Sequence, residues 1–161
     1  MRSRALYKVY IIASSALLAA IAVYCFARSQ PPALFPQPGS MLGLATLDGE
    51  LFGSAPSFFY TLALGLFIGL AAPSAKAARS SCLMWIVLSL CLELSQLPVL
   101  SYALVEWLQA PVPGWAWDLV GPYWTRGVFD PFDLLATLVG GFIAMNILCG
   151  FSGGIKNEFI G

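Results

Sequence analysis

Four apolar runs in the amino-acid sequence, each long enough to cross a membrane as a helix, constrain what this chain can fold into. A helix that crosses the hydrocarbon core of a bilayer needs about 20 mostly apolar residues. Runs of this kind cover residues 9–26, 54–72, 82–100 and 132–151, and their only charged residues are Glu93 and Asp133. The sequence therefore predicts an all-α integral membrane bundle of four transmembrane helices, in one multi-pass domain over residues 1–161.

The composition agrees with this class and excludes several functions. Hydrophobic residues make up 59% of the chain and charged residues 10%, whereas a soluble domain carries about 25% charged residues. The formal net charge is zero and no basic cluster exists, so nucleic-acid binding has no electrostatic basis. Histidine is absent, which excludes histidine catalysis and argues against a zinc or haem site. The four cysteines form no CxxC pair, so we expect no metal, no cofactor and no disulfide framework.

The first apolar run also has some features of a signal peptide. Basic residues precede it, and Ala27 follows it near a suitable cleavage point. The run is longer than the apolar region of a signal peptide, which has about 7 to 15 residues. Tyr24 before Cys25 is also unlike a lipoprotein cleavage site. We therefore expect the run to be retained as a membrane helix.

The basic residues predict how the chain is oriented in the membrane, because loops on the cytoplasmic side carry an excess of Lys and Arg. With the N-terminus in the cytoplasm, only Arg28 and Arg126 lie outside, and the opposite orientation reverses this count. Both termini and a short loop at 73–81 are then cytoplasmic, and two long loops face outward. The basic residues placed inside are Arg2, Arg4, Lys8, Lys76, Arg79 and Lys156.

The two outward loops differ in character. Residues 28–53 are rich in proline, which discourages regular structure. Residues 101–129 are aromatic, and such rings favour the headgroup layer of a bilayer, so this loop is expected at the outer interface. Within it, residues 101–110 either extend the third helix beyond Pro98 or form a short interfacial helix. The aromatic residues of this loop are Tyr102, Trp107, Trp115, Trp117, Tyr123, Trp124 and Phe129.

The third apolar run contains two polar residues whose presence in a membrane span needs an explanation. Glu93 and Gln96 are three residues apart, so they share one face of a helix. If the span covers residues 82–100, Glu93 lies about 3 Å outward of its midpoint, where an ionised carboxylate costs about 2.5–3.5 kcal/mol. The carboxyl group is then paired with another group, exposed to a water-filled cavity, or protonated. Alternatively, a protonated Glu93 and Gln96 form interhelical hydrogen bonds that hold the bundle together.

A second set of polar residues lies at the start of the fourth apolar run. Asp130 fits a helix N-cap, Pro131 fits the first helical position and Asp133 the third, so capping accounts for at least one of the two acids. Thr137 and the small residues Gly140 and Gly141 continue along or beside the Asp133 face and permit close approach by a neighbouring helix. Gly65 and Gly69 form a GxxxG pair in the second run, which is likewise typical of close packing between helices.

These two groups together predict an outward-opening polar vestibule. Glu93 in the assumed span lies about 12 Å below the edge of the hydrocarbon, farther than an arginine side chain reaches. We therefore expect Glu93 and Gln96 to form the floor of the vestibule. Its rim is expected to consist of Arg126, Asp130 and Asp133, with Thr137 beside them.

The order and spacing of these residues resemble those of the VanZ-like membrane proteins, a family named for an accessory teicoplanin-resistance protein. The resemblance covers about residues 85–149. The chain departs from the family at Thr137, where an Asn is common, and in its long stretch between the Gln and the Arg. The resemblance implies a multi-spanning bacterial protein of the cytoplasmic membrane that acts on or near an outer-leaflet lipid or glycolipid. The matching positions are Glu93, Gln96, Arg126, Asp130, Asp133 and Gly140.

Three functions agree with these observations. In the first, the vestibule binds or modulates an outer-leaflet lipid or cell-envelope precursor, with Arg126 on its anionic headgroup. In the second, the chain is an accessory or structural subunit whose aromatic loop docks a membrane-protein partner. The third and less favoured is an enzyme in which Glu93, Asp130 and Asp133 perform acid–base chemistry or bind a divalent metal on a lipid-linked substrate. The chain lacks a Ser-centred elbow and a phosphate-cradling loop.

Overall fold

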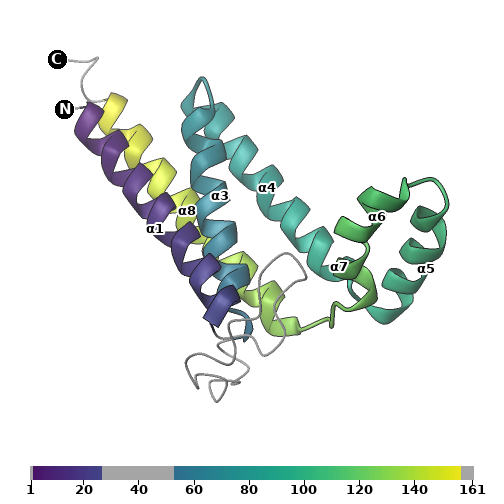
Figure 1. Cartoon of the computed structure of the whole chain (residues 1–161). Helices are drawn as coiled ribbons and strands as arrows, with labels where there is room; N and C mark the ends of the chain where they lie inside the picture. The colour runs from purple at the N-terminus through teal and green to yellow at the C-terminus, as the bar shows by residue number, and fades with distance from the viewer. Residues whose placement is uncertain (1, 27–52, 157–161) are drawn as a thin grey trace.

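The computed structural model describes residues 2–26 and 53–156, and its regular elements there are helices. Four long helices pack together, and three short ones form a lobe beside them (Figure 1). The predicted proline-rich loop lies almost wholly outside the described residues. The long helices are α1 (Arg2–Phe26), α3 (Ala55–Ala71), α4 (Ala75–Ser95) and α8 (Pro131–Lys156), and the lobe contains α5 (Pro98–Gln109), α6 (Gly114–Val120) and α7 (Pro122–Thr125).

The prediction of four membrane spans is confirmed in part. Three helices are long and apolar enough to cross a membrane, over Leu6–Val23, Ala75–Ser95 and Pro131–Gly150. Helix α3 is also apolar but has 17 residues, fewer than an average span needs. The described residues therefore form a helical protein of the membrane type with three candidate spans and a shorter apolar helix packed among them.

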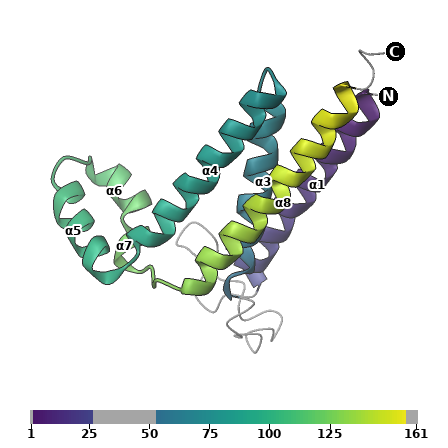
Figure 2. The ribbon, with the colours of Figure 1, turned by 180° about the vertical axis from the view of Figure 1, so that it is seen from behind.

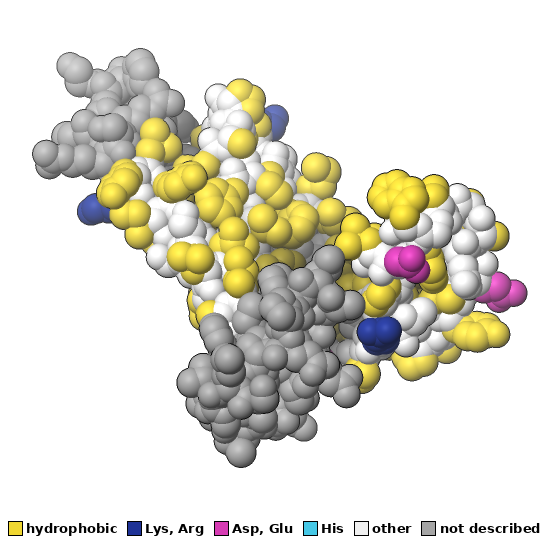
Figure 3. Space-filling view, viewed as in Figure 1, with side chains coloured by type: hydrophobic (Ala, Val, Ile, Leu, Met, Phe, Trp, Pro, Cys, Tyr) yellow, Lys and Arg dark blue, Asp and Glu magenta, His cyan; other side chains and the backbone are white. Residues whose placement is uncertain are grey.

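Helix α3 lies at the centre of the bundle, where it packs against α1, α4 and α8 (Figures 1 and 2). Its Leu62, Ala63 and Leu66 are buried in the core. The outward faces of the bundle carry large apolar side chains such as Met84, which is 71% exposed, and Phe142, which is 69% exposed. Figure 3 shows hydrophobic side chains distributed along the face of the bundle that the described residues present. A surface of this kind is suited to lipid rather than to water.

Small residues let α8 approach its neighbours closely. A Cβ atom added at Gly140 would lie 2.5 Å from the Phe58 carbonyl oxygen of α3. One added at Gly65 would lie 3.3 Å from both the Cβ of Ala144 and the Sγ of Cys82. The backbones of α3 and α8 are therefore packed at a distance that larger residues would prevent, which confirms the packing predicted for these glycines.

Helix α4 differs from the predicted third span, 82–100. It begins at Ala75, because the Ser74 hydroxyl accepts a hydrogen bond from the Ala77 N–H at 3.2 Å and caps the helix. It ends at Ser95, because Pro98 disfavours a helical backbone at the residue before it, and Leu97 is extended with ψ of 133°. The predicted loop 73–81 is therefore mostly helical. Glu93 lies near the end of its helix rather than near the middle.

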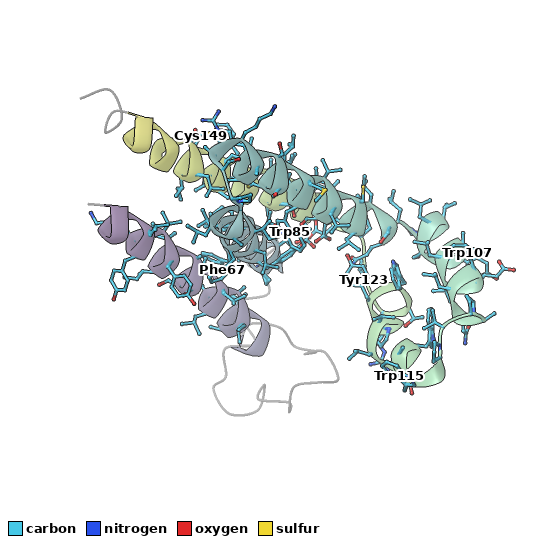
Figure 4. All side chains as sticks on the ribbon, turned by 90° about the horizontal axis from the view of Figure 1, so that it is seen from above. Phe67, Trp85, Trp107, Trp115, Tyr123 and Cys149 are labelled. Atoms are coloured by element: carbon cyan, nitrogen blue, oxygen red, sulfur yellow. The ribbon has the colours of Figure 1, made fainter. Side chains whose placement is uncertain are left out.

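The aromatic loop folds into the lobe of α5, α6 and α7. Of the two alternatives for residues 101–110, a separate short helix is the correct one, since α5 starts anew at Pro98. The Trp124 indole N–H donates a hydrogen bond to the Ser95 Oγ at 2.9 Å, which ties the lobe to the end of α4. Figure 4 shows Trp107 and Trp115 on this lobe, away from the packed long helices.

The long helices alternate in direction. The start of α1, the turn between α3 and α4, and the end of α8 lie at one end of the bundle (Figures 1 and 2). The starts of α3 and α8, the end of α4 and the lobe lie toward the other end, called the lobe end below. This alternation determines which side chains of α3, α4 and α8 can meet.

Candidate functional site

Two acids meet at the lobe end, although they are 40 residues apart in the sequence. The Ser57 hydroxyl of α3 donates to the Asp133 Oδ1 of α8 at 2.9 Å and lies 3.4 Å from the Glu93 Oε1 of α4. The Tyr60 hydroxyl donates to the same Glu93 oxygen at 3.1 Å. Glu93 and Asp133 are each only 6% exposed. One serine therefore joins the two carboxyl groups inside the helix packing.

The position of each residue in its helix explains this meeting. Ser57 and Asp133 are the third residues of α3 and α8, and Glu93 is the third residue from the end of α4. Each therefore lies about 3 Å inside the lobe end of its helix. The first turn of α8 also favours the Asp133 carboxylate, because the helix dipole is positive there. The predicted position of Glu93 near the middle of its helix is wrong because α4 starts and ends earlier than the assumed span.

A second set of buried hydroxyl groups lies deeper in the bundle. Thr61, Ser89 and Thr137 are fully buried, and their side-chain oxygens make no hydrogen bond of standard geometry with the described residues. Thr61 and Thr137 interact with the Tyr60 phenol. The Tyr60 ring also meets the Trp85 ring edge to face, with their centroids 6.4 Å apart. Tyr60 thus connects the acid pair to the hydroxyl groups below it.

The remaining predicted residues lie outside this cluster. Asp130 caps α8, since its Oδ1 accepts from the Phe132 N–H at 2.9 Å, which confirms the predicted N-cap. Gln96 follows the last turn of α4, and its side-chain amide lies against Gly127, where an added Cβ would be 3.2 Å from the Nε2. Arg126 is exposed. Of the six predicted residues, the structure brings together Glu93, Asp133 and Thr137, while Gln96, Arg126 and Asp130 occupy the loop region beside them.

Sequence reasoning missed Ser57, Tyr60, Thr61 and Ser89. A signal for the first three was present, because spacings of three and four residues put them on one face of an otherwise apolar helix. Ser89 lies one helical turn before Glu93, so these two residues also share one face of their helix. Uncharged hydroxyl residues are common in membrane helices, so this signal indicates a site only when their partners on other helices are known.

The chemistry of the cluster is that of oxygen ligands and hydrogen bonds. Among the described residues, no group of three or more His, Cys, Asp or Glu side chains could hold a metal ion. No family model, curated protein or solved structure matches this chain. The resemblance to VanZ-like proteins therefore depends on the residues named above alone.

Proposed function

We propose that this chain is a VanZ-like protein of the bacterial cytoplasmic membrane that binds or modulates an anionic lipid or cell-envelope precursor in the outer leaflet. The observation that supports this best is the aromatic lobe at the end of the bundle where Arg126 and the acid pair also lie. The proposal has three parts: four membrane crossings, cytoplasmic termini and a headgroup site at the lobe end.

The direction of the helices supports four crossings. Helices α1 and α4 both run toward the lobe end (Figure 1), so the chain has to return between them, and α3 makes that return. Its 17 residues span about 25 Å, slightly less than the 30 Å hydrocarbon core. Because α3 is surrounded by three other helices, its ends need less contact with lipid than those of an outer helix.

The charges support cytoplasmic termini. Lys8, Lys76 and Arg79 belong to the helix ends that lie opposite the lobe. Arg126 follows α7 on the lobe side. This distribution follows the positive-inside rule when the lobe faces outward.

Side chains of the lobe are suited to a membrane surface. Tyr102, Trp107 and Trp115 are 75%, 73% and 76% exposed, and such rings favour the headgroup layer. Arg126 follows α7 of the same lobe, is exposed, and offers a planar set of N–H donors to a phosphate oxygen. A phosphorylated headgroup in the outer leaflet is the ligand that this combination of aromatic rings and a guanidinium fits best.

Replacing Arg126 with alanine is expected to reduce the stabilisation of the protein by an anionic lipid. One basic residue near an anionic surface contributes about 1 kcal/mol, which corresponds to about 2–4 °C in Tm for a chain of this size. The experiment compares the Tm of the purified full chain with phosphatidylglycerol and with phosphatidylcholine. The Arg79→Ala variant, which removes a basic residue from the opposite end of α4, measures the loss due to charge alone, and Arg126→Ala should lose more of the difference than this variant does. Equal lipid responses in Arg126→Ala and the parent would contradict the headgroup site.

The topology has its own test by cysteine labelling of cells. In a chain whose natural cysteines are replaced, Val128→Cys adds a thiol at a position that is 80% exposed on the lobe side. A membrane-impermeant maleimide should label this variant in intact cells. Ser74→Cys, in the turn between α3 and α4, should react only after the membrane is opened. The reverse pattern would place the termini outside and contradict the orientation.

A further inference from the structure

Three helices each contribute a pair of polar residues to one buried cluster. Within each pair the residues are four positions apart, so they lie on the same face of their helix. All six residues are at most 6% exposed. The pairs are Ser57 and Thr61 on α3, Ser89 and Glu93 on α4, and Asp133 and Thr137 on α8.

The directions of the helices sort these residues into two layers. Because α4 runs opposite to α3 and α8, the later residue of its pair lies at the same level as the earlier residues of the other two pairs. The outer layer therefore contains Glu93 and Asp133, joined by Ser57. About 6 Å deeper, one helical turn away, the inner layer contains three hydroxyl groups, those of Thr61, Ser89 and Thr137.

The inner layer is the second observation that bears on a ligand. Its three hydroxyl oxygens are fully buried and make no standard hydrogen bond with the described residues. A buried hydroxyl without such a bond is unfavourable, so native proteins rarely keep several together unless they contact something else. Thr61 and Thr137 make at most a hydrogen bond of poor geometry to the Tyr60 phenol, whose hydroxyl bonds to Glu93, and Ser89 lacks even that contact among the described residues. The two threonine hydroxyl groups are thus connected to the acid layer above them.

The donor atoms identify the class of ligand. Every polar group of the two layers is an oxygen, and carboxylate and hydroxyl oxygens favour hard cations over softer transition metals. The carboxyl groups of Glu93 and Asp133 both lie within 3.4 Å of the Ser57 hydroxyl, and two carboxyl groups so close together are stabilised by a positive charge between them. Mg²⁺ usually keeps several waters, which the buried surroundings do not favour. A monovalent ion loses its hydration shell at a lower cost than a divalent one.

We propose that these two layers form a buried site for one dehydrated monovalent cation of the Na⁺ class, bound between the carboxyl groups and the inner hydroxyl groups. The ion joins α3, α4 and α8 next to the lobe. It is independent of the lipid proposed above, because it occupies the bundle interior and does not use Arg126.

Sodium should therefore stabilise the full chain in detergent micelles. At a concentration about tenfold above its Kd, Na⁺ is expected to raise the Tm by about 3–5 °C over choline at equal ionic strength. Equilibrium dialysis with radioactive sodium should find one ion bound per chain. Equal Tm values in Na⁺ and choline would overturn the site. Stabilisation by Ca²⁺ but not by Na⁺ would overturn the monovalent assignment.

Matched variants separate ligand binding from folding. Thr137→Val keeps the shape of the side chain but removes one inner hydroxyl, so it should fold, lose the Na⁺ response and be at least as stable as the parent in choline. Asp133→Asn should also lose the Na⁺ response. Thr125→Val, in the lobe, makes the same change as Thr137→Val away from the cluster and should keep the response. A full Na⁺ response in Thr137→Val would overturn the proposed ligand set, whereas the Arg126→Ala result has no bearing on it.

Discussion

Replacing Gly140 with leucine is expected to lower the free energy of unfolding by about 3 kcal/mol, because α3 and α8 can no longer pack at their present distance. The first side-chain atom would meet the Phe58 carbonyl oxygen at 2.5 Å and the Leu62 backbone nitrogen at 3.4 Å. Both neighbours are backbone atoms of a helix and cannot rotate away as a side chain can. The two helices would therefore have to separate, which also disturbs the buried cluster one turn away.

The matched control for this substitution is Gly150→Leu in the same helix. A Cβ atom at Gly150 has nothing within 4 Å, so this variant should unfold close to the parent. For a chain of this size, a loss of about 3 kcal/mol corresponds to a fall in Tm of about 6–12 °C. Circular dichroism during heating in detergent measures the difference. Equal Tm values for the two variants would show that α3 and α8 are not in close contact at Gly140.

Removing the Ser57 hydroxyl has the second large expected effect. Ser57→Ala deletes the donor to Asp133 at 2.9 Å and the polar group 3.4 Å from Glu93. Loss of a donor to a buried carboxyl acceptor costs about 2 kcal/mol, and this is expected to exceed the small gain in helix propensity from alanine. The same change at Ser101, whose hydroxyl makes an exposed bond to the Pro98 carbonyl at 3.2 Å, should have little effect.

A double-mutant cycle separates this hydrogen bond from general packing. In the Asp133→Asn background, Ser57→Ala should cost clearly less than in the parent, because the carboxyl acceptor is no longer present. Unfolding free energies of the parent, both single variants and the double variant are measured in the same detergent. Additive costs would contradict a direct Ser57–Asp133 interaction.

Much of the fold could be predicted from the sequence, because the governing terms are local. Apolar runs without charge form helices in a membrane whatever surrounds them. The cap at Asp130 and Pro131 depends on adjacent residues, and the sequence prediction for it was correct. The end of the third span was placed too far along the chain. Apolarity continues past Pro98, but proline restricts the backbone of the residue before it, and this restriction ends the helix despite the apolar side chains that follow.

The candidate site was only half predictable for a different reason. A carboxyl group in an apolar run has a large transfer cost, so Glu93 and Asp133 stand out in the sequence. Ser57, Thr61 and Ser89 have small transfer costs and therefore gave no comparable signal. The predicted vestibule includes Arg126 and Gln96 because of their order in the sequence, whereas the structure places them in the loop region outside the buried cluster.

The sequence by itself determined that this chain is helical, apolar and suited to a membrane, because those properties follow from the transfer free energy of each run and from contacts between neighbouring residues. Only the tertiary structure decided which polar groups meet. That outcome depends on where α4 ends, on the opposite directions of α3 and α4, and on how closely Gly140 lets α8 approach. Such contacts join residues as far apart as Ser57 and Asp133, and no local pattern specifies them.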